Sequence, residues 1–446
     1  MWARTPWRRS SKSCPTRSRY RRRIPIPIPP PAGDDPLAAR TLMNRQQIGT
    51  RTLEQVRDHY RRYLFDEYVP FWTRHGIDHE RGGFFCTLDH DGTRINDSKN
   101  MWYQGRGLWT YAYLARHFAH DESLQVARRT SEFLRAHGRD AEGWWVIELD
   151  AEGNTTQPAT QRGYASLFVA EGMTAYAAVS GDDEALELAI ETLLRVVDLY
   201  AQPGRPVDEG YIPLCYPGMR VLGSHMVLIL TLTQMLELRP DDTRLASLAK
   251  QMVEGITVNF WNEKYRLMNE ALALDLSRPD DDNEDFSYLG HAIETMWMTM
   301  AEALRIGDRA LFDLCAERFR RHVEVAWDDV HGGLFRALKI NSHSYELDKV
   351  LWLQEEGLIG CLLLMEHTDD EWAWSWFARI FDWIETYCSL KPHGYPLYQS
   401  AGDRTMTHQP HVTRKEHYHH PRCVMRCLLG LERMVERGGA VSGVWA

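Results

Sequence analysis

Apolar residues recur at helical spacing along most of this chain. They do so over residues 108–118, 167–179, 226–238, 293–304 and 358–365, where they fall three and four positions apart. Each stretch therefore predicts a helix with at least one buried face. Short turns rich in glycine and aromatic residues alternate with these stretches from about residue 53 to residue 433.

One kind of turn returns six times between the predicted helices. A glycine followed by aromatic or apolar residues stands at positions 82, 143, 210, 332 and 394, and Lys264 marks a weaker version without glycine. Successive turns lie 54 to 68 residues apart, which fits two helices with their connections. A period of this length indicates a repeat architecture. The residues after each glycine predict a short strand.

Six helix pairs either close on themselves or continue as an open solenoid. The turns carry aromatic and charged residues in place of plain caps, and the richest polar clusters come from distant repeats. Both features favour closure. We therefore predict an all-α fold, an (α/α)6 barrel with short antiparallel strands in the inter-helix loops. Loops at one end of the inner helices would converge on a ligand site.

The first 42 residues differ in composition from the rest. They begin with nine basic and no acidic residues up to Arg23, followed by a proline-rich run. Such a segment buries no core, so we predict a disordered extension over residues 1–42 and a single catalytic domain over residues 43–446. The extension is read either as a basic arm or transit peptide, or, as we favour, as a segment that the natural protein lacks.

Composition and charge exclude several classes of function. A net charge of −10 leaves no basic face for nucleic acid, and no run of 18 apolar residues predicts a membrane span. Sixteen Trp residues favour a carbohydrate ligand, whose C–H faces stack on aromatic rings. The eight cysteines form no disulfide framework, which predicts the cytoplasm. Cys423 and Cys427 would be two buried thiols on one helix face.

Two histidines stand at the start of predicted helices. His419 lies in the stretch 415–422, where Lys, Glu, Tyr, Arg and three His precede an apolar run. Pro421 suits the first turn of that helix. His291 opens another apolar helix. A single histidine at the start of a helix, such as His291, would usually cap the helix or pack in the core. Because there are two such histidines, we predict that His291 and His419 face each other across one pocket and exchange a proton with a sugar carbon.

Two further helix starts, and the one that carries His291, hold candidate substrate-binding residues. Arg106 follows Trp102 and Tyr103, and it would hold an oxygen-rich ligand or pair with an acid on a neighbouring helix. Glu294 stands three residues after His291, so it shares a helix face and would orient that imidazole. In the third, residues 349–356, one or both acids and a Trp would face the pocket or form a solvated helix start. A fourth, with His225, is favoured as core.

Known motifs for metals, phosphates and nucleotides are absent from the sequence. It contains no His-Glu-x-x-His, no Cys-x-x-Cys, no phosphate loop and no Gly-x-Gly-x-x-Gly. We therefore predict no metal and no cofactor.

Five motifs in order resemble the N-acylglucosamine 2-epimerase family, which also holds cellobiose 2-epimerases and aldose–ketose isomerases. They are Gly82-Gly83-Phe84-Phe85, Trp102-Tyr103-Gln104-Gly105-Arg106, Gly290-His291-Ala292-Ile293-Glu294, Lys349-x-x-Trp352-x-Gln354-x-Glu356 and Tyr418-His419-x-Pro421-Arg422. The resemblance runs from about residue 56 to residue 434 and implies an (α/α)6 barrel.

The resemblance also implies roles. It makes His291 and His419 the acid/base pair at C2 of an aldose, working through an enediolate, with Arg106 near the carbonyl oxygen and His420 a bystander. The expected substrate-binding residues are Arg106, Glu294, Glu356, Trp102, Tyr103, Trp352 and Arg422. A homodimer is a further expectation.

One stretch departs from the family pattern. Several epimerases and isomerases carry an Asn-x-His-Met-His-type motif with a later Glu, where this chain has a single histidine at His225 and Leu230 further on. The Tyr-His-x-Pro-Arg ending lies nearer to the N-acylglucosamine branch.

Other readings of the function remain. An aldose–ketose isomerase would use the same residues. A glycoside hydrolase would draw its two carboxylates from Asp285, Glu294 and Glu356. A catalytically dead sugar-binding protein is the third alternative.

Overall fold

The computed structural model describes residues 46–160, 163–207 and 210–445. Residues Asn44–Ala446 form one compact unit. The extension predicted over residues 1–42 lies outside the described residues, so it and its boundary stay predictions.

Helices of two kinds alternate along the described chain. The inner helices are α3 (Met101–Phe118), α5 (Tyr164–Ser180), α7 (Leu222–Leu238), α9 (Leu289–Ile306), α11 (Leu351–His367) and α13 (His419–Glu436). The outer helices are α1 (Leu53–Arg62), α4 (Asp121–His137), α6 (Asp183–Tyr200), α8 (Thr243–Glu254), α10 (Arg309–Ala326) and α12 (Glu371–Tyr387). A π-helical turn (Tyr63–Tyr68) and α2 (Val69–His75) continue α1, and a second π-helical turn (Gly255–Asn259) continues α8. A 3-10 turn (Lys391–His393) follows α12.

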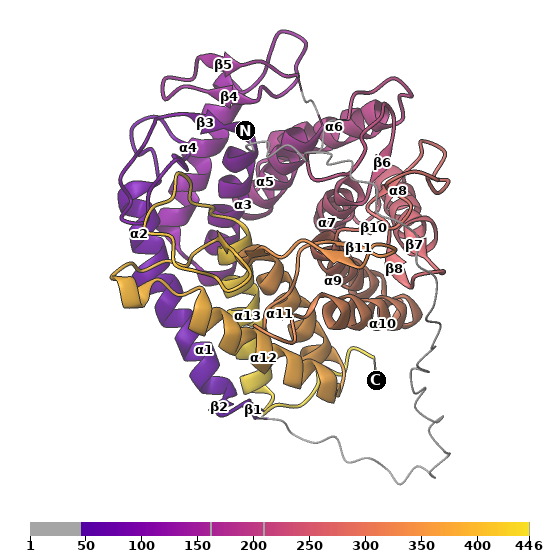
Figure 1. Ribbon diagram of the computed structural model, residues 1–446. Helices are drawn as coiled ribbons and strands as arrows, with labels where there is room; N and C mark the ends of the chain where they lie inside the picture. Colours follow the sequence, from indigo (N-terminus) through magenta and orange to yellow (C-terminus); the bar gives the residue numbers. More distant parts are fainter. Residues whose placement is uncertain (1–45, 161–162, 208–209, 446) are drawn as a thin grey trace, which may run out of the picture. The chain divides into compact units, whose positions relative to one another are not determined.

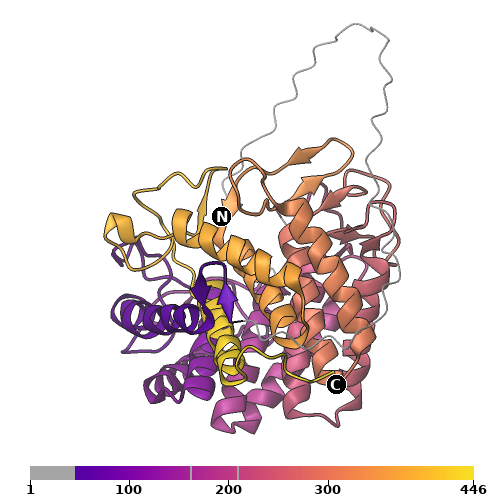
Figure 2. The ribbon, with the colours of Figure 1, turned by 90° about the horizontal axis from the view of Figure 1, so that it is seen from below.

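The inner helices form a ring. Each contacts the next in the order α3, α5, α7, α9, α11 and α13, and α13 returns to contact α3. Five outer helices pack on the inner helix that precedes them in the chain, and α1 packs on α13. The indigo and yellow segments of the described chain therefore meet side by side (Figures 1 and 2). The predicted (α/α)6 barrel is confirmed.

Polarity explains which helices lie inside. In α5, α7 and α11 most residues are buried on every side, because these helices are apolar all round. The outer helices α4, α8, α10 and α12 bury one stripe and expose the other. Four outer helices begin on an aspartate whose carboxylate accepts backbone N–H bonds, namely Asp182, Asp242, Asp308 and Asp370. Such caps satisfy the open first turn at the surface.

Most of the short antiparallel strands lie near the N-terminal ends of the inner helices. The strands are β1 (Gln47–Ile48), β2 (Arg51–Thr52), β3 (Lys99–Asn100), β4 (Glu148–Leu149), β5 (Thr155–Gln157), β6 (Arg220–Val221), β7 (Trp261–Asn262), β8 (Leu267–Met268), β9 (Ala271–Leu272), β10 (Phe286–Ser287), β11 (Leu338–Lys339), β12 (Ser344–Tyr345), β13 (Lys349–Val350) and β14 (Ala401–Gly402). β1 and β2 instead pair with each other just before the outer helix α1. β3, β6, β10 and β13 run directly into α3, α7, α9 and α11. They pair with β4, β9, β11 and β14, the strands that follow the next outer helices. The strands thus fix the inner-helix starts in a rim.

The recurring turns are small hairpins. Isolated antiparallel bridges close them at Ile77↔Phe84, Arg139↔Trp145, Trp327↔Leu334 and Ser389↔Tyr398. The turn without glycine around Lys264 is the connection of a regular hairpin, β7 with β8. The turn predicted at position 210 includes residues 208–209, which lie outside the described residues.

In two of the hairpins, a buried lysine–aspartate ion pair of the same kind holds the turn in place. Lys99 Nζ donates to Asp78 Oδ2 at 2.8 Å and to the Gly82 carbonyl at 2.8 Å. Lys349 Nζ donates to Asp328 Oδ2 at 3.0 Å in the corresponding place. Both lysines are fully buried. Lys349, which belongs to one of the family motifs, is therefore a structural residue of the rim.

Among the described residues, every helix is either too short or too polar to span a lipid bilayer.

Candidate active site

Both predicted histidines lie at inner-helix starts. His291 is the third residue of α9 and His419 is the first residue of α13. Their rings lie against one indole, that of Trp352 on α11, with ring centroids 6.0 and 5.3 Å away. His291 is 9% exposed and His419 is 7% exposed, so each imidazole is nearly enclosed and keeps a small accessible edge. The structure therefore brings together the two side chains, 128 positions apart in the sequence, in one cluster.

A buried carboxylate orients His419. The Nδ1 atom of His419 lies 2.8 Å from Oε1 of Glu356, which stands on α11 and is fully buried. Nδ1 also lies 3.1 Å from Nη2 of Arg422, which can only donate. The shorter contact is with the carboxylate, which can only accept, so it assigns the proton to Nδ1 and leaves Nε2 as the nitrogen that exchanges protons. Burial alone would raise the pKa of Glu356, but the charges of Arg422 and His419 lower that pKa to about 2. Glu356 therefore stays ionised beside His419.

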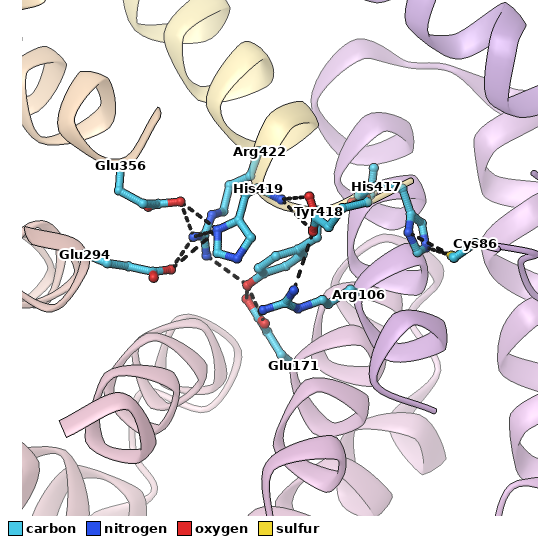
Figure 3. Close-up of polar contacts among 11 residues, drawn as sticks. Cys86, Arg106, Glu171, Glu294, Glu356, His417, Tyr418, His419 and Arg422 are labelled. Atoms are coloured by element: carbon cyan, nitrogen blue, oxygen red, sulfur yellow. Dashed lines mark hydrogen bonds and ion pairs between the residues drawn. The ribbon is translucent and has the colours of Figure 1, made fainter. Parts of the chain in front are cut away.

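Arg422 joins three helices behind His419. Its Nη2 atom donates to Glu356 Oε1 at 2.6 Å and, on a shorter contact, to Glu294 of α9. Its Nη1 atom donates to the hydroxyl of Tyr418 at 2.9 Å. Arg422 is fully buried, and these anions raise its pKa well above the usual value against the effect of burial. Figure 3 shows the guanidinium beside His419, between the two carboxylates and Tyr418.

Two carboxylates and one imidazole of this cluster could together supply the ligand atoms of a metal site. One ligand atom from each of Glu294, Glu356 and His419 lies within 4.8 Å of the other two. The Arg422 guanidinium already neutralises both carboxylates, so these residues do not require a metal ion to balance their charge.

His291 has a carboxylate partner that the sequence did not reveal. Its Nδ1 atom lies 2.9 Å from Oε1 of Glu270, a fully buried residue between β8 and β9. Tyr211 donates to the same oxygen at 3.1 Å, and the backbone N–H of Gly223 donates at 3.3 Å. As with His419, the carboxylate assigns the proton to Nδ1. The expectation that Glu294 orients His291 is therefore corrected.

Glu294 turns away from His291 because a buried cation needs it. The guanidinium of Arg422 lies between α9 and α13, and burying such a group without anions is costly. Glu294 is 2% exposed and lies 3.9 Å from His419 Nδ1, so it stands behind His419 with Glu356. Helical spacing gave the correct face of α9 for Glu294 but the wrong partner.

Arg106 lies on α3, among aromatic rings. Its guanidinium carbon is 4.8 Å from the ring of Trp102, 4.1 Å from that of Phe168 and 4.7 Å from that of Tyr418. Its Nη1 atom is 3.5 Å from Glu416, and its buried Nε has no hydrogen-bond partner among the described residues. The alternative of an arginine paired to an acid is thus present in the structure, although the pair is long.

Tyr103 is the remaining predicted aromatic residue. It is half-buried beside Trp102, with ring centroids 6.2 Å apart and nearly parallel planes. Burial raises the pKa of its hydroxyl. Trp102, Tyr103 and Arg106 therefore form one patch on the first inner helix.

Sequence reasoning also missed Glu171. Both of its carboxylate oxygens accept from the Tyr418 hydroxyl, at 2.9 and 2.7 Å, and Gln234 donates to it at 3.2 Å. Burial raises the pKa of Glu171. The signal was available, because Glu171 is the one charged residue in the apolar helix α5. Glu270, by contrast, follows a short strand and carries no distinguishing pattern.

Neighbouring motif residues point elsewhere. His420 binds Glu355 through Nδ1 and lies 2.7 Å from the Tyr63 hydroxyl through Nε2, away from Trp352. Of the two adjacent acids on α11, Glu356 therefore belongs to the cluster and Glu355 does not. His417 is fully buried, with Nδ1 3.3 Å from the Cys86 sulfur (Figure 3). His225 is buried against Phe260, as expected of a core residue.

The remaining predictions about single residues are settled by burial. Cys423 and Cys427 are buried free thiols on α13 with their sulfurs 3.8 Å apart, as predicted. Asp285 is nearly fully buried and accepts a hydrogen bond from the Asn341 backbone at 2.7 Å.

Comparisons with known proteins agree with this architecture. The sequence profile of the N-acylglucosamine 2-epimerase (GlcNAc 2-epimerase) family matches residues 82–423. N-acylglucosamine 2-epimerase of Bos taurus is 27% identical over 342 residues, 72% of this chain and 77% of that protein. Cellobiose 2-epimerase of Ruminococcus albus is 23% identical over 380 residues, 79% of this chain and 91% of that protein. The crystal structure of a D-mannose isomerase has a TM-score of 0.70 at 18% identity and covers 85% of this chain and 97% of its own.

The closed ring of inner helices, with a polar cluster at their N-terminal ends, defines an (α/α)6-barrel protein. The family match spans well over half of the sequence. The chain belongs to the N-acylglucosamine 2-epimerase family, which confirms the resemblance drawn from the five motifs.

Proposed function

We propose that this protein is a sugar isomerase that removes and returns the proton at C2 of an open-chain aldose, with His291 and His419 as its two bases. Membership of a family of epimerases supports the reaction class. The observation that carries the residue assignment is the pair of imidazoles against Trp352, each bound through Nδ1 to its own buried carboxylate.

The matched partners explain how the imidazoles work. Each carboxylate fixes the tautomer with the proton on Nδ1, so that Nε2 is the nitrogen that takes or gives the proton at C2. One neutral histidine removes the C2 proton, and the other, protonated, delivers a proton to the opposite face. Two bases are needed because a single base on one face would return the proton with the same configuration.

The enediolate that forms between these steps needs a cation. Arg106 is the candidate, because its side chain keeps a small exposed part and its one ion pair with a described residue, Glu416, is long at 3.5 Å. A hydrogen-bond donor held before the reaction stabilises a developing oxyanion without reorganisation. Trp352, Trp102 and Tyr103 would bind the C–H faces of the sugar. Glu294, Glu356 and Arg422 would act through His419.

Return of the proton to C1 instead of C2 would give aldose–ketose isomerisation with the same residues. A glycoside hydrolase is disfavoured, because Glu294 and Glu356 are 2% and 0% exposed and both face the Arg422 guanidinium. Neither is therefore placed to protonate a glycosidic oxygen.

The test is a panel of sugars in heavy water, followed by proton NMR. N-acetylglucosamine, glucose, mannose, cellobiose and a sulfated sugar are each incubated with the enzyme. We expect one of them to lose its C2 proton signal to deuterium and to yield its C2 epimer or ketose. Binding without exchange for every sugar would support a catalytically dead binding protein, and a shorter product with a new reducing end would support a hydrolase.

Substitution of either base tests the assignment. His291→Ala and His419→Ala should each abolish turnover while circular dichroism and the melting temperature show a folded protein. His225→Ala, which removes a core histidine, is the control expected to lose stability and keep its rate when folded. Near-normal turnover in either active-site variant would contradict the roles.

We further propose a cytoplasmic homodimer. Six of the described cysteines, Cys423 and Cys427 among them, are free thiols, which supports a reducing compartment. The dimer rests on family resemblance. Light scattering of the purified protein and fractionation of the source cells test the two statements.

A further inference from the structure

We propose that the opposite end of the barrel holds a second binding site, for a phosphate-class oxyanion. The catalytic candidates cluster at the N-terminal ends of the inner helices. At the other end, a hollow of about 130 Å³, partly open to solvent, lies between the C-terminal halves of α3, α5 and α7 and the middle of α13. None of the predicted substrate or catalytic residues lines it.

Basic side chains dominate this hollow. Arg116 and His117 come from the end of α3, and Arg426 comes from α13. The one acid in its lining, Glu237 on α7, is half exposed and lies 3.9 Å from Arg116, at the limit of an ion pair. The charge of the hollow is therefore incompletely balanced by the protein itself.

Arg426 is the group best placed to hold an anion. It forms no ion pair with any described residue, and its Nε atom is buried without a hydrogen-bond acceptor. Its guanidinium lies 5.8 Å from the ring of Tyr113 and 5.0 Å from that of Trp297, which hold it in place. The Nε atom is enclosed, so an oxyanion in the hollow would bind the two NH2 groups of the guanidinium, which form no ion pair with a described residue.

The ring of His117 adds a second donor. It packs on Tyr113 with centroids 4.1 Å apart, and burial together with the charges of Arg116, Arg426 and Arg433 lowers its pKa to about 4. Burial is the largest cause of this lowered pKa and the three guanidinium charges add to it, so at neutral pH His117 is uncharged and offers one N–H. Two arginines and an imidazole N–H around one space suit the several acceptor oxygens of a phosphate, which arginine binds on two at once.

The hollow is larger than a bare phosphate requires, so it has room for a phosphate monoester of a small molecule.

The position of the hollow also links it to the candidate active site. Arg426 lies over the indole of Trp297, and the Nε1 atom of that indole donates to Glu356 at 2.7 Å. An anion on Arg426 would therefore be separated by one aromatic ring from the carboxylate that orients His419. The site itself does not depend on the proposed sugar chemistry.

Calorimetry on the full chain at low salt tests the proposal. Inorganic phosphate and glycerol 3-phosphate are the two probes, and they separate free phosphate from a phosphate monoester. We expect saturable binding of at least one probe at one site per chain. Arg426→Gln should weaken it roughly ten- to hundredfold, the range for loss of a charged hydrogen bond.

Two further variants make the test specific. Arg379→Gln removes an arginine that also lies over an indole, 4.1 Å from the ring of Trp327, but outside the hollow, and it should leave binding unchanged. Ala178→Phe fills the hollow without altering its charge and should abolish binding. The proposal is overturned if neither probe binds saturably, or if binding survives both Arg426→Gln and Ala178→Phe. Because the readout is binding, its failure is distinct from a failure of the sugar chemistry.

Discussion

Replacing Glu356 by glutamine should separate its structural role from its role beside His419. The Glu356 carboxylate accepts from His419 Nδ1 at 2.8 Å, from Arg422 at 2.6 Å and from Trp297 Nε1 at 2.7 Å. A glutamine offers one acceptor oxygen and one NH2 group, so at least one of these buried donors would face another donor. Arg422 would also keep only Glu294 as a counter-charge. We estimate a loss of about 2–4 kcal/mol in the free energy of unfolding.

The effect on turnover should be much larger than the effect on stability. If the amide NH2 faces Nδ1 of His419, the favoured tautomer carries its proton on Nε2, which is then unable to accept the C2 proton. A protonated imidazole also loses its anion. Enzyme variants that hold the wrong histidine tautomer, in comparable pairs of a histidine and a carboxylate, lose a factor of roughly 10²–10⁴ in kcat. We expect a loss of this size in Glu356→Gln, measured as sugar turnover by NMR at a temperature where the variant is folded.

The matched control stands on the same helix. Glu366 is 1% exposed near the end of α11 and accepts from Arg433 at 2.6 and 2.8 Å, far along the helix from His419. Glu366→Gln should destabilise the protein by a comparable or smaller amount and leave kcat within about twofold of the original, because a carboxylate remote from His419 does not select its tautomer. Equal losses of kcat in the two variants, or an unchanged kcat in Glu356→Gln, would refute the reasoning.

Two predictions concern stability. Lys99→Met leaves the Asp78 carboxylate buried without its cation and should lower the free energy of unfolding by about 3–5 kcal/mol, measured by urea denaturation. Lys349→Met should lower it less, because Arg404 still donates to Asp328. A larger loss for Lys349→Met than for Lys99→Met would contradict the account. The second concerns His322, whose Nε2 accepts the Met268 N–H at 2.9 Å and whose pKa burial lowers to about 4. Its unfolded form binds the proton first, so stability is full above about pH 6.5 and falls as the pH drops towards 4, by up to about 1.4 kcal/mol per pH unit. His322→Gln should lower stability at pH 7.5 and flatten this dependence in urea titrations, and an unchanged slope would contradict it.

The sequence predicted the architecture because the barrel repeats. Helical periodicity and the glycine turns are local signals, and six returns of the same unit reinforce one another. The turn around Lys264 shows that the unit survives without its glycine, since β7 and β8 still pair. The sequence predicted that short strands exist at the rim but not which strands pair, because the pairing depends on how adjacent helix pairs meet.

The site was predicted where a helix start carries the residue, and missed where a partner comes from elsewhere. The sequence predicted that His291 and His419 lie in one cluster, since each stands at the start of an apolar helix, and both rings do lie against Trp352. Glu270 was not found, because its role depends on a β-rim contact across the fold. Glu294 was found but given the wrong partner, because spacing along a helix does not register a buried guanidinium arriving from α13.

The central claim is that two imidazoles act on opposite faces of one carbon atom. The direct measurement is C2 proton exchange in heavy water, with each purified epimer of the turned-over sugar supplied separately to His291→Gln and to His419→Gln. We predict that neither variant interconverts the epimers, and that each still exchanges the C2 proton of one epimer, a different one for each variant. Interconversion by either variant, or exchange of the same epimer by both, would contradict the account.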